Sequence, residues 1–192
     1  MNVAGRSAHI CLFVGLCVDL DMVRYITLLL FIGLVWGQDC IADDGTDGVE
    51  LWGECYSIAN TTELHLGNNE LTGPIPPEIG NLTNLTYLGL YLNQLTGIIS
   101  PEIGNLTNLT WLDLGNNGLI GSIPPEIGNL TNLTHLNLRY NQLNGEIPES
   151  ICDLNIEWST SWSFNISNNQ LCPPYPSCIE DYVGTQDTSD CP

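Results

Sequence analysis

The string PEIGNLTNLT occurs three times in this 192-residue chain, starting at Pro77, Pro101 and Pro125. Successive copies start 24 residues apart. Self-similarity at a fixed period of about 20–50 residues is typical of a solenoid, because each repeat is a unit that cannot bury its apolar face alone. The period therefore constrains the fold more strongly than any other feature of the sequence.

The chain aligns on this period as five successive units with the common pattern L-x-L-x-x-N-x-L-x-G-x-I-P. In the second unit Leu88 and Leu90 alternate with polar or aromatic neighbours, which predicts a short strand with one buried face. The string PEIGNLTNLT then supplies a helical turn on the opposite, convex side, where Ile103 and Leu106 point inward. The fifth unit follows a four-residue insertion. The predicted strand regions are 63–71, 87–95, 111–119, 135–143 and 163–171.

Two further columns of the alignment have structural interpretations. An Asn follows each strand, and a stacked ladder of Asn amides is predicted to bond backbone groups that the turn leaves unpaired. A Gly follows the Asn and fits a tight turn. The Asn column is Asn69, Asn93, Asn117, Asn141 and Asn169. The Gly column is Gly73, Gly97, Gly121 and Gly145.

These recurring positions make the chain similar to the plant-type leucine-rich repeat family over roughly residues 50–180. The resemblance implies an α/β solenoid of about five 24-residue repeats, with short parallel strands on the concave face and disulfide-bonded caps. It divides the chain into an N-terminal extension and signal peptide (1–37), an N-terminal cap (38–60), the repeats (61–171), and a C-terminal cap and tail (172–192). Family members include inhibitors of polygalacturonases, which degrade pectin, and receptor ectodomains for peptides and hormones.

The cysteines also fit a capped rod. The chain has eight of them, and none falls between Cys55 and Cys152. This distribution fits staples at the two ends of a rod rather than a metal cluster, which needs close ligand spacings. Disulfides imply an oxidising compartment.

The pairing of the six cysteines beyond residue 37 is predicted in part. Position and the family resemblance imply that Cys40 pairs with Cys55 in the N-terminal cap. For the C-terminal cap sequence alone leaves two arrangements open. The expected one is Cys152–Cys172 with Cys178–Cys191, and the alternative is Cys172–Cys178 with Cys152–Cys191.

The N-terminal region is typical of a secretory signal. Arg24 precedes the run YITLLLFIGLVWG, which has the length of a signal-peptide core and is too short to span a bilayer. We expect cleavage between Gly37 and Gln38, a secreted or cell-surface protein, and no stable membrane span after signal removal. The alternative is a signal anchor that joins HICLFVGLCV to this run, which would bury Asp19 and Asp21 in the membrane at a high cost.

Charge and motifs exclude several functions. The net charge is −19, and Arg139 is the only Lys or Arg after residue 37. Such a chain repels nucleic acid and anionic lipid, so neither is an expected partner. Only His65 and His135 remain after signal removal, without a nucleophile-elbow motif, so we expect no enzyme and no cofactor. The stretch DDGTDGVELWGE fits a calcium loop poorly, because Gly45 occupies the third ligand position and offers no side-chain oxygen.

The repeats also carry N-x-S/T sequons. Copying one repeat copies its sequons, so they are weak evidence for glycosylation. The sequons lie at Asn60, Asn81, Asn84, Asn105, Asn108, Asn129, Asn132 and Asn165.

The exposed strand positions hold the candidate binding site. The residues before the first core Leu of each unit form a column with aromatic side chains at its centre, and polar groups and the single Arg flank it. Tyr, Trp and Arg are frequent anchors at protein interfaces. The predicted ligand-binding residues are Tyr87, Tyr91, Trp111, Asp113, His135, Asn137 and Arg139.

Three functions are considered, in decreasing order of preference. The first is protein or peptide recognition through the concave face. The second is carbohydrate binding, because sugar rings stack on aromatic faces and hydrogen-bond to Asp or Asn. The third is ice binding through regular polar rows on the convex side. These rows are Asn81, Asn105 and Asn129, and Thr83, Thr107 and Thr131.

Overall fold

The computed structural model describes residues 9–12, 16–19 and 39–192 of the chain, which divide into the units Met1–Gln38 and Asp39–Pro192. In the first unit β1 (His9–Leu12) and β2 (Leu16–Asp19) form an antiparallel pair. The expected signal run and its cleavage site lie outside the described residues, so both remain predictions. No helix among the described residues is long and apolar enough to cross a membrane.

The second unit begins with a small antiparallel sheet that caps the solenoid. Its strands are β3 (Asp39–Ile41), β4 (Asp47–Leu51) and β5 (Glu54–Ser57). The predicted Cys40–Cys55 disulfide is confirmed and joins β3 to β5. The β3–β4 turn is held by Asp44, whose carboxylate accepts hydrogen bonds from the Thr46 hydroxyl (2.6 Å) and the Asn60 Nδ2 (2.8 Å). These bonds lower the pKa of Asp44 to about 2.

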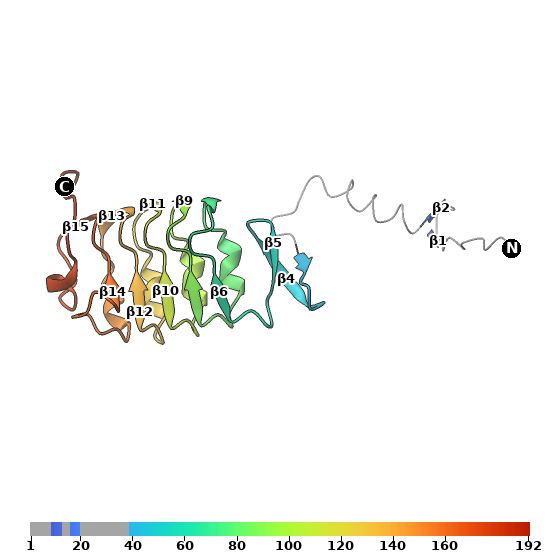
Figure 1. The fold of residues 1–192 in the computed structure, drawn as a ribbon, viewed down its shortest axis with the longest axis horizontal. Coiled ribbons are helices and arrows are strands. Elements are labelled where there is room, and N and C mark those ends of the chain that lie inside the picture. The colour runs from blue at the N-terminus through green and yellow to red at the C-terminus, as the bar shows by residue number, and fades with distance from the viewer. Residues whose placement is uncertain (1–8, 13–15, 20–38) are drawn as a thin grey trace. The chain divides into compact units, whose positions relative to one another are not determined.

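A parallel five-stranded sheet, hereafter the main sheet, follows the cap (Figure 1). Its strands pair in register one period apart, so Trp111 lies beside Tyr87 on one side and His135 on the other. The predicted parallel strands are thus confirmed. They are β6 (Glu63–His65), β8 (Tyr87–Gly89), β10 (Trp111–Asp113), β12 (His135–Asn137) and β14 (Phe164–Asn165).

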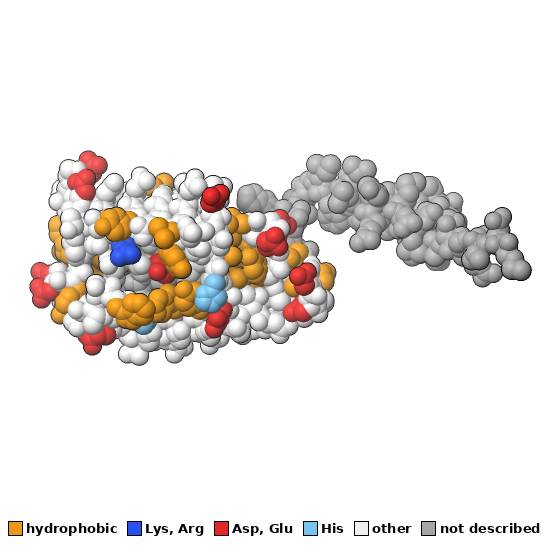
Figure 2. Space-filling view, viewed as in Figure 1, with side chains coloured by type: hydrophobic (Ala, Val, Ile, Leu, Met, Phe, Trp, Pro, Cys, Tyr) orange, Lys and Arg blue, Asp and Glu red, His pale blue; other side chains and the backbone are white. Residues whose placement is uncertain are grey.

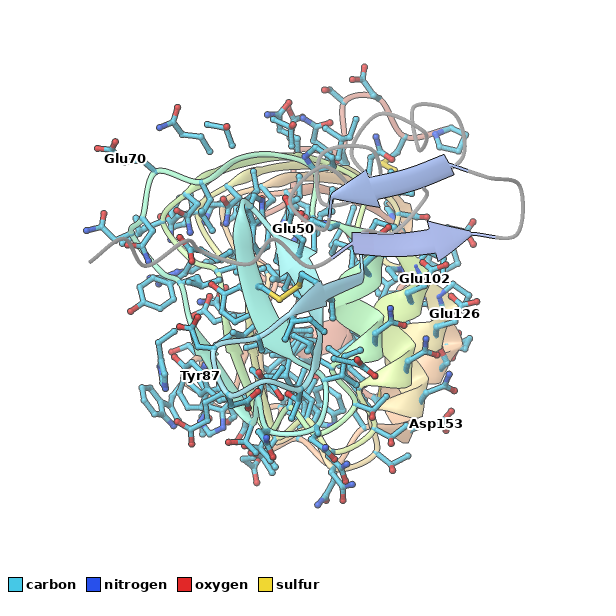
Figure 3. All side chains as sticks on the ribbon, turned by 90° about the vertical axis from the view of Figure 1, so that its right-hand side faces the viewer. Glu50, Glu70, Tyr87, Glu102, Glu126 and Asp153 are labelled. Atoms are coloured by element: carbon cyan, nitrogen blue, oxygen red, sulfur yellow. A yellow bond between two sulfur atoms is a disulfide. The ribbon has the colours of Figure 1, made fainter. Side chains whose placement is uncertain are left out.

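Each coil continues through a second short strand and a helical turn. The second sheet comprises β7 (Thr72–Gly73), β9 (Gln94–Gly97), β11 (Gly118–Gly121), β13 (Gln142–Glu146) and β15 (Gln170–Cys172). The helical turns are 3₁₀ helices: η1 (Pro77–Asn81), η2 (Pro101–Asn105), η3 (Pro125–Asn129), η4 (Glu149–Asp153) and η5 (Glu180–Tyr182). Figure 3 shows Tyr87 of the main sheet on the opposite side of the coil from Glu102 and Glu126 of these helices. The repeat therefore exposes two separate faces, one of strands and one of helices.

The core is a stack of aliphatic side chains between the main sheet and the 3₁₀ helices. Leu88, Leu90 and Leu106 are fully buried, and Ile103 is 1% exposed. Burying one such side chain stabilises a fold by roughly 1.5–3 kcal/mol relative to leaving it in water. Since each coil shares its leucines with both neighbours, the coils are stable only as a stack.

The Asn ladder predicted from the sequence is confirmed for four of its five members, whereas the exposed side chain of Asn69 makes no such bond among the described residues. The buried Asn141 is representative: its Oδ1 accepts the Leu119 N–H (3.0 Å), and its Nδ2 donates to the carbonyls of Leu114 (3.0 Å) and Leu138 (3.1 Å). One amide thus bonds its own coil and the preceding one. The same pattern is made by Asn93, Asn117 and Asn169.

The C-terminal tail extends this ladder by one irregular coil. The Gln186 Nε2 donates to the carbonyls of Ile166 (3.0 Å) and Val183 (2.7 Å), and its Oε1 accepts the Leu171 N–H (3.2 Å). Gln186 therefore makes the bonds that Asn makes in the regular repeats. It also lies next to Asn169 through a parallel β-bridge.

The expected disulfides of the C-terminal cap are wrong, as is the alternative. The structure pairs Cys152 with Cys178 and Cys172 with Cys191, with Cα–Cα distances of 5.8 and 5.6 Å. Our expectation gave the tail no repeat of its own. Because the tail forms a further coil, each bridge instead joins one coil to the next: Cys152 of η4 pairs with Cys178 in the coil that contains β15, and Cys172 of β15 pairs with Cys191 in the tail.

The ladder predicts a large cost for removing one amide. Asn141→Ala leaves the Leu119 N–H and the Leu114 and Leu138 carbonyls without this partner, and an unsatisfied buried group costs about 1–3 kcal/mol. We expect the free energy of unfolding to fall by at least about 2 kcal/mol in urea denaturation. Asn144→Ala, on an exposed side chain of β13, is the matched control and should change it little. Equal stability of the two variants would contradict the ladder's role.

The disulfides predict a specific peptide map. Proteolysis without reduction, followed by mass spectrometry, should give one peptide pair joined by Cys152–Cys178 and another joined by Cys172–Cys191. Replacing Cys172 and Cys191 together by Ala should lower stability by about 2–5 kcal/mol, the usual cost of losing a native disulfide. A Cys172–Cys178 crosslink in the native protein would contradict the coil arrangement of the tail.

Candidate functional site

A row of four stacked rings crosses the main sheet. It consists of His65, Tyr87, Trp111 and His135 and is called the aromatic row below. Successive ring centroids are 4.3, 5.7 and 3.9 Å apart, with interplanar angles of 28°, 23° and 16°. Figure 2 shows a hydrophobic band, with a histidine at one end, along the face that the main sheet forms. In-register strands about 4.8 Å apart place the rings at stacking distance, so the row follows directly from the 24-residue period.

Glycines beside the row make room for the tyrosine rings. A Cβ on Gly89 would lie 2.9 Å from the ring of Tyr87, and a Cβ on Gly67 would lie 2.5 Å from the ring of Tyr91. Both distances are too short for real Cβ contacts. The absence of a side chain at Gly89 and Gly67 therefore gives the rings of Tyr87 and Tyr91 room to pack close to the backbone.

The segment 157–163, which lies in the part of the chain that contains the four-residue insertion, adds a fifth ring. Trp162 makes edge-type contacts with Trp111 and with His135, each at 5.1 Å between centroids and at angles of 73° and 86°. Its side chain is 71% exposed. Sequence reasoning missed Trp162, because a residue in an insertion has no register in the repeat. The available signal was the tryptophan-rich run WSTSW, which begins at Trp158.

Sequence reasoning also placed His65 outside the aromatic column. Its ring leans toward the column and stacks on Tyr87, while its Nε2 lies 2.9 Å from the Glu63 Oε2. The contact with Glu63 orients the ring. The row is therefore one residue longer than predicted.

Burial changes the titration of two rings. Burial lowers the pKa of His135, which favours its neutral form. Burial also raises the pKa of Tyr87, with smaller contributions from Tyr91, Asp113 and Glu63. The Nε1 of Trp111 and the Nε2 of His135 are inaccessible and have no hydrogen-bond partner among the described residues.

The polar candidate residues have local partners. The Asp113 Oδ1 accepts the Gly115 N–H (2.9 Å), and the Asn137 Oδ1 accepts the Arg139 N–H (3.2 Å). The Arg139 guanidinium lies 5.8 Å from the centroid of the Tyr140 ring. The structure thus brings Tyr87, Trp111 and His135 into contact, whereas Asp113 and Asn137 shape the turns after their strands.

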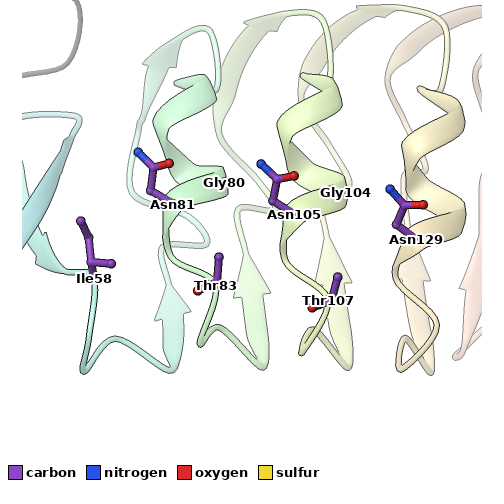
Figure 4. A pocket seen from close by; sticks show the side chains of 8 residues that line it. All are labelled: Ile58, Gly80, Asn81, Thr83, Gly104, Asn105, Thr107 and Asn129. Carbon is purple, nitrogen blue, oxygen red and sulfur yellow. The ribbon is translucent and has the colours of Figure 1, made fainter.

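The helical side carries a shallow groove of about 700 Å³ (Figure 4). Asn81, Asn105 and Asn129 project along it at the ends of successive helices. A Cβ on Gly80 or Gly104 would lie 2.5 or 2.6 Å from a carbonyl of the next helix, so these glycines keep the helices close together.

Each sequon pair on this side has two different environments. The first Asn of each pair is an exposed residue at a helix end, whereas the second is engaged with the neighbouring coil. The Nδ2 atoms of Asn84, Asn108 and Asn132 donate to carbonyls of the preceding coil at 2.9, 2.9 and 2.8 Å. Glycosylation remains a prediction.

Comparison with known proteins agrees with the coil geometry. A leucine-rich repeat model matches residues 59–119, and a two-copy leucine-rich repeat model matches residues 107–154. The chain is 30% identical to a chain of the BIR3–SERK2 complex from Arabidopsis thaliana, with a TM-score of 0.54 and 69% of each chain covered. The chain belongs to the leucine-rich repeat family, and its repeats are of the plant type. No curated protein matches it.

Two further structures bear on function. The Arabidopsis receptor kinase HAESA, in complex with the peptide hormone IDA and the co-receptor SERK1, is 35% identical at a TM-score of 0.58, with 65% of this chain and 21% of that chain covered. A plant ice-binding protein is 36% identical at a TM-score of 0.50, with 57% of this chain and 34% of that chain covered. The chain thus spans about a fifth and a third of these two proteins.

The environment of His135 predicts a pH dependence. Because its folded-state pKa is lowered, the stabilisation linked to the neutral ring is complete above the ordinary pKa of 6.5 and is lost as the pH falls through the folded-state pKa. NMR titration of the ring should give a midpoint below 6.5. In His135→Gln, the loss of stability between pH 8 and pH 5 should be smaller than in the wild type. A midpoint at or above 6.5 would contradict the burial of this ring.

Proposed function

We propose that this protein is a secreted or cell-surface module that recognises a protein or peptide ligand through its main sheet. The observation that carries this proposal is the continuous aromatic row, together with Trp162 at its edge. The resemblance to an ectodomain that binds a peptide hormone supports it. Binding rather than catalysis is the activity that this surface offers.

The row has the properties of an interface anchor. Its rings stack on one another and are held by the sheet, so little side-chain entropy is lost when a ligand binds. Tyr, Trp and Arg are enriched among residues that dominate binding energy. Arg139 adds the one fixed positive charge beyond residue 37, which suits it to a carboxylate on the ligand.

The stacking geometry disfavours the carbohydrate alternative. Sugars bind aromatic residues through open ring faces, yet in the two closest pairs, His65–Tyr87 at 4.3 Å and Trp111–His135 at 3.9 Å, the rings cover one another's faces. Their edges are what a ligand meets. Ring edges carry partial positive charge and attract carbonyl oxygens, which peptides present in abundance.

A screen of the secreted protein on peptide and glycan arrays tests the proposal. The expected result is binding to a set of peptides that share a side-chain pattern. Selective binding to glycans, without peptide binding, would replace the proposal with the carbohydrate alternative.

Truncating the central ring predicts a loss of affinity. For a peptide found in the screen, Trp111→Ala should raise the dissociation constant by more than about tenfold, because truncating a hot-spot Trp costs at least about 2 kcal/mol. Arg139→Ala should weaken carboxylate-bearing peptides more than neutral ones. Isothermal titration calorimetry measures both effects. Tyr182→Ala, an exposed aromatic in η5, is the control and should leave affinity unchanged. Unchanged affinity in both Trp111→Ala and Arg139→Ala would show that the peptide binds at another site.

Ice binding by the helical side is a second candidate, favoured by the regular Asn row and by similarity to the plant ice-binding protein (Figure 4). This function predicts faceted ice crystals and slowed recrystallisation at micromolar protein. Asn105→Tyr places a bulky ring in the middle of the row and should abolish the effect, whereas Trp111→Ala should preserve it. Crystals that grow as in buffer alone would eliminate this candidate.

A further inference from the structure

Trp162 covers one end of the aromatic row. The centroids of Trp111 and His135 are 3.9 Å apart, and that of Trp162 lies 5.1 Å from each. A ring that is equidistant from two stacked rings and nearly perpendicular to both lies beside the stack and makes edge-type contacts with both rings. Trp162 is nevertheless 71% exposed. It therefore contacts both rings of the pair while remaining largely in solvent itself.

The rings of Trp111 and His135 hold two polar atoms that form no hydrogen bond within the described part of the chain. These atoms are the Trp111 Nε1 and the His135 Nε2, and neither is accessible to solvent. Leaving a buried donor or acceptor unsatisfied is unfavourable, and contact with an aromatic ring recovers only part of the lost free energy. A ligand group that reached both atoms would recover it.

Thr134 favours the tautomer of His135 that carries its proton on Nδ1. The Thr134 Oγ1 donates its only hydrogen to the Thr110 carbonyl (3.1 Å) and lies 3.2 Å from the His135 Nδ1. With that hydrogen used, the hydroxyl oxygen accepts from Nδ1–H. Thr86 and Thr110 make the same bond to the preceding coil, so the repeat fixes its direction. In the neutral ring the Nε2 is therefore a hydrogen-bond acceptor.

We propose that Trp162 is a displaceable cover over a donor–acceptor pair, the Trp111 Nε1–H and the His135 Nε2, and that this pair binds a primary carboxamide on the ligand. The carboxamide is the side-chain group of Asn or Gln. Its oxygen accepts the indole hydrogen, and its amino group donates to the imidazole. The inference rests on the proposed function and adds the chemistry of one ligand residue.

Other common groups match this pair less well. A carboxylate has no hydrogen to donate to the His135 Nε2, and the strongly acidic chain repels it. A trans peptide unit presents its carbonyl and N–H on opposite sides, so it cannot engage both atoms at once. A primary carboxamide presents an oxygen and an N–H on the same side.

Hydrogen exchange tests the cover without any ligand. In the full chain labelled with ¹⁵N, the indole N–H of Trp111 should exchange at least about 100-fold faster than the backbone N–H of Leu112, because displacing one exposed side chain costs far less than global unfolding. Trp162→Ala should accelerate the indole exchange by at least about tenfold, whereas Trp162→Phe, which keeps a ring, should change it little. Indole exchange as slow as that of Leu112, or no acceleration in Trp162→Ala, would overturn the cover.

Small-molecule titration tests the ligand chemistry. In the Trp162→Ala variant, acetamide should shift the Trp111 indole signal at a concentration at least about tenfold lower than acetate, in line with one hydrogen bond of about 1–1.5 kcal/mol. The ¹⁵N shift of His135 should report an unprotonated Nε2 above its pKa. Equal effects of acetamide and acetate, or a protonated Nε2, would overturn the assignment.

The outcomes also separate this inference from the proposed function. If the indole exchanges fast and acetamide binds selectively, but the protein binds no peptide, the proposed function is refuted and this inference is not. If peptide binding depends on Trp111 but shows no preference for Asn or Gln, and acetamide and acetate have equal effects, this inference is refuted and the proposed function is not.

Discussion

One hydrogen-bonding amide per coil holds this molecule in register. Asn141 bonds backbone groups of its own coil and of the coil before it, and Gln186 continues the pattern in the tail. Because these bonds are buried, a slip of one residue would leave several backbone groups unsatisfied. The buried leucines provide most of the stabilising free energy, whereas the amides fix the position of each coil relative to the next. All exposed rows depend on that register.

The register of the coils aligns side chains on both faces of the solenoid, but with different results. On the main sheet the in-register strands bring Tyr87, Trp111 and His135 into one stack. On the helical side the same period aligns Asn81 and Asn105 along the groove. The helical row repeats one residue type, as a copied unit does by default. The main-sheet row differs from coil to coil, and such variation on a fixed scaffold is what a recognition surface requires.

The repeats, the Asn ladder and the N-terminal disulfide could be predicted because they depend on local pattern or on periodicity. The disulfide partners of Cys152 and of Cys172 could not be predicted, since they depend on how an irregular tail folds onto the last coil. Trp162 was missed for the same reason: an insertion leaves the repeat register, and only its fold places it over Trp111. The orientation of the aromatic rings could not be predicted from the sequence either. The column of aromatic residues was evident, but the stacking that covers their faces, and weakens the carbohydrate interpretation, follows from side-chain packing.

The central claim is that the main sheet, and not the helical side, is the recognition surface. Hydrogen–deuterium exchange of the free protein and of its complex with the strongest peptide from the array tests it most directly, because both faces are observed in one experiment. The account predicts added protection at β8, β10, β12 and the segment 157–163, with η1, η2 and η3 unchanged. Protection confined to the helices, with the main sheet unchanged, would contradict it.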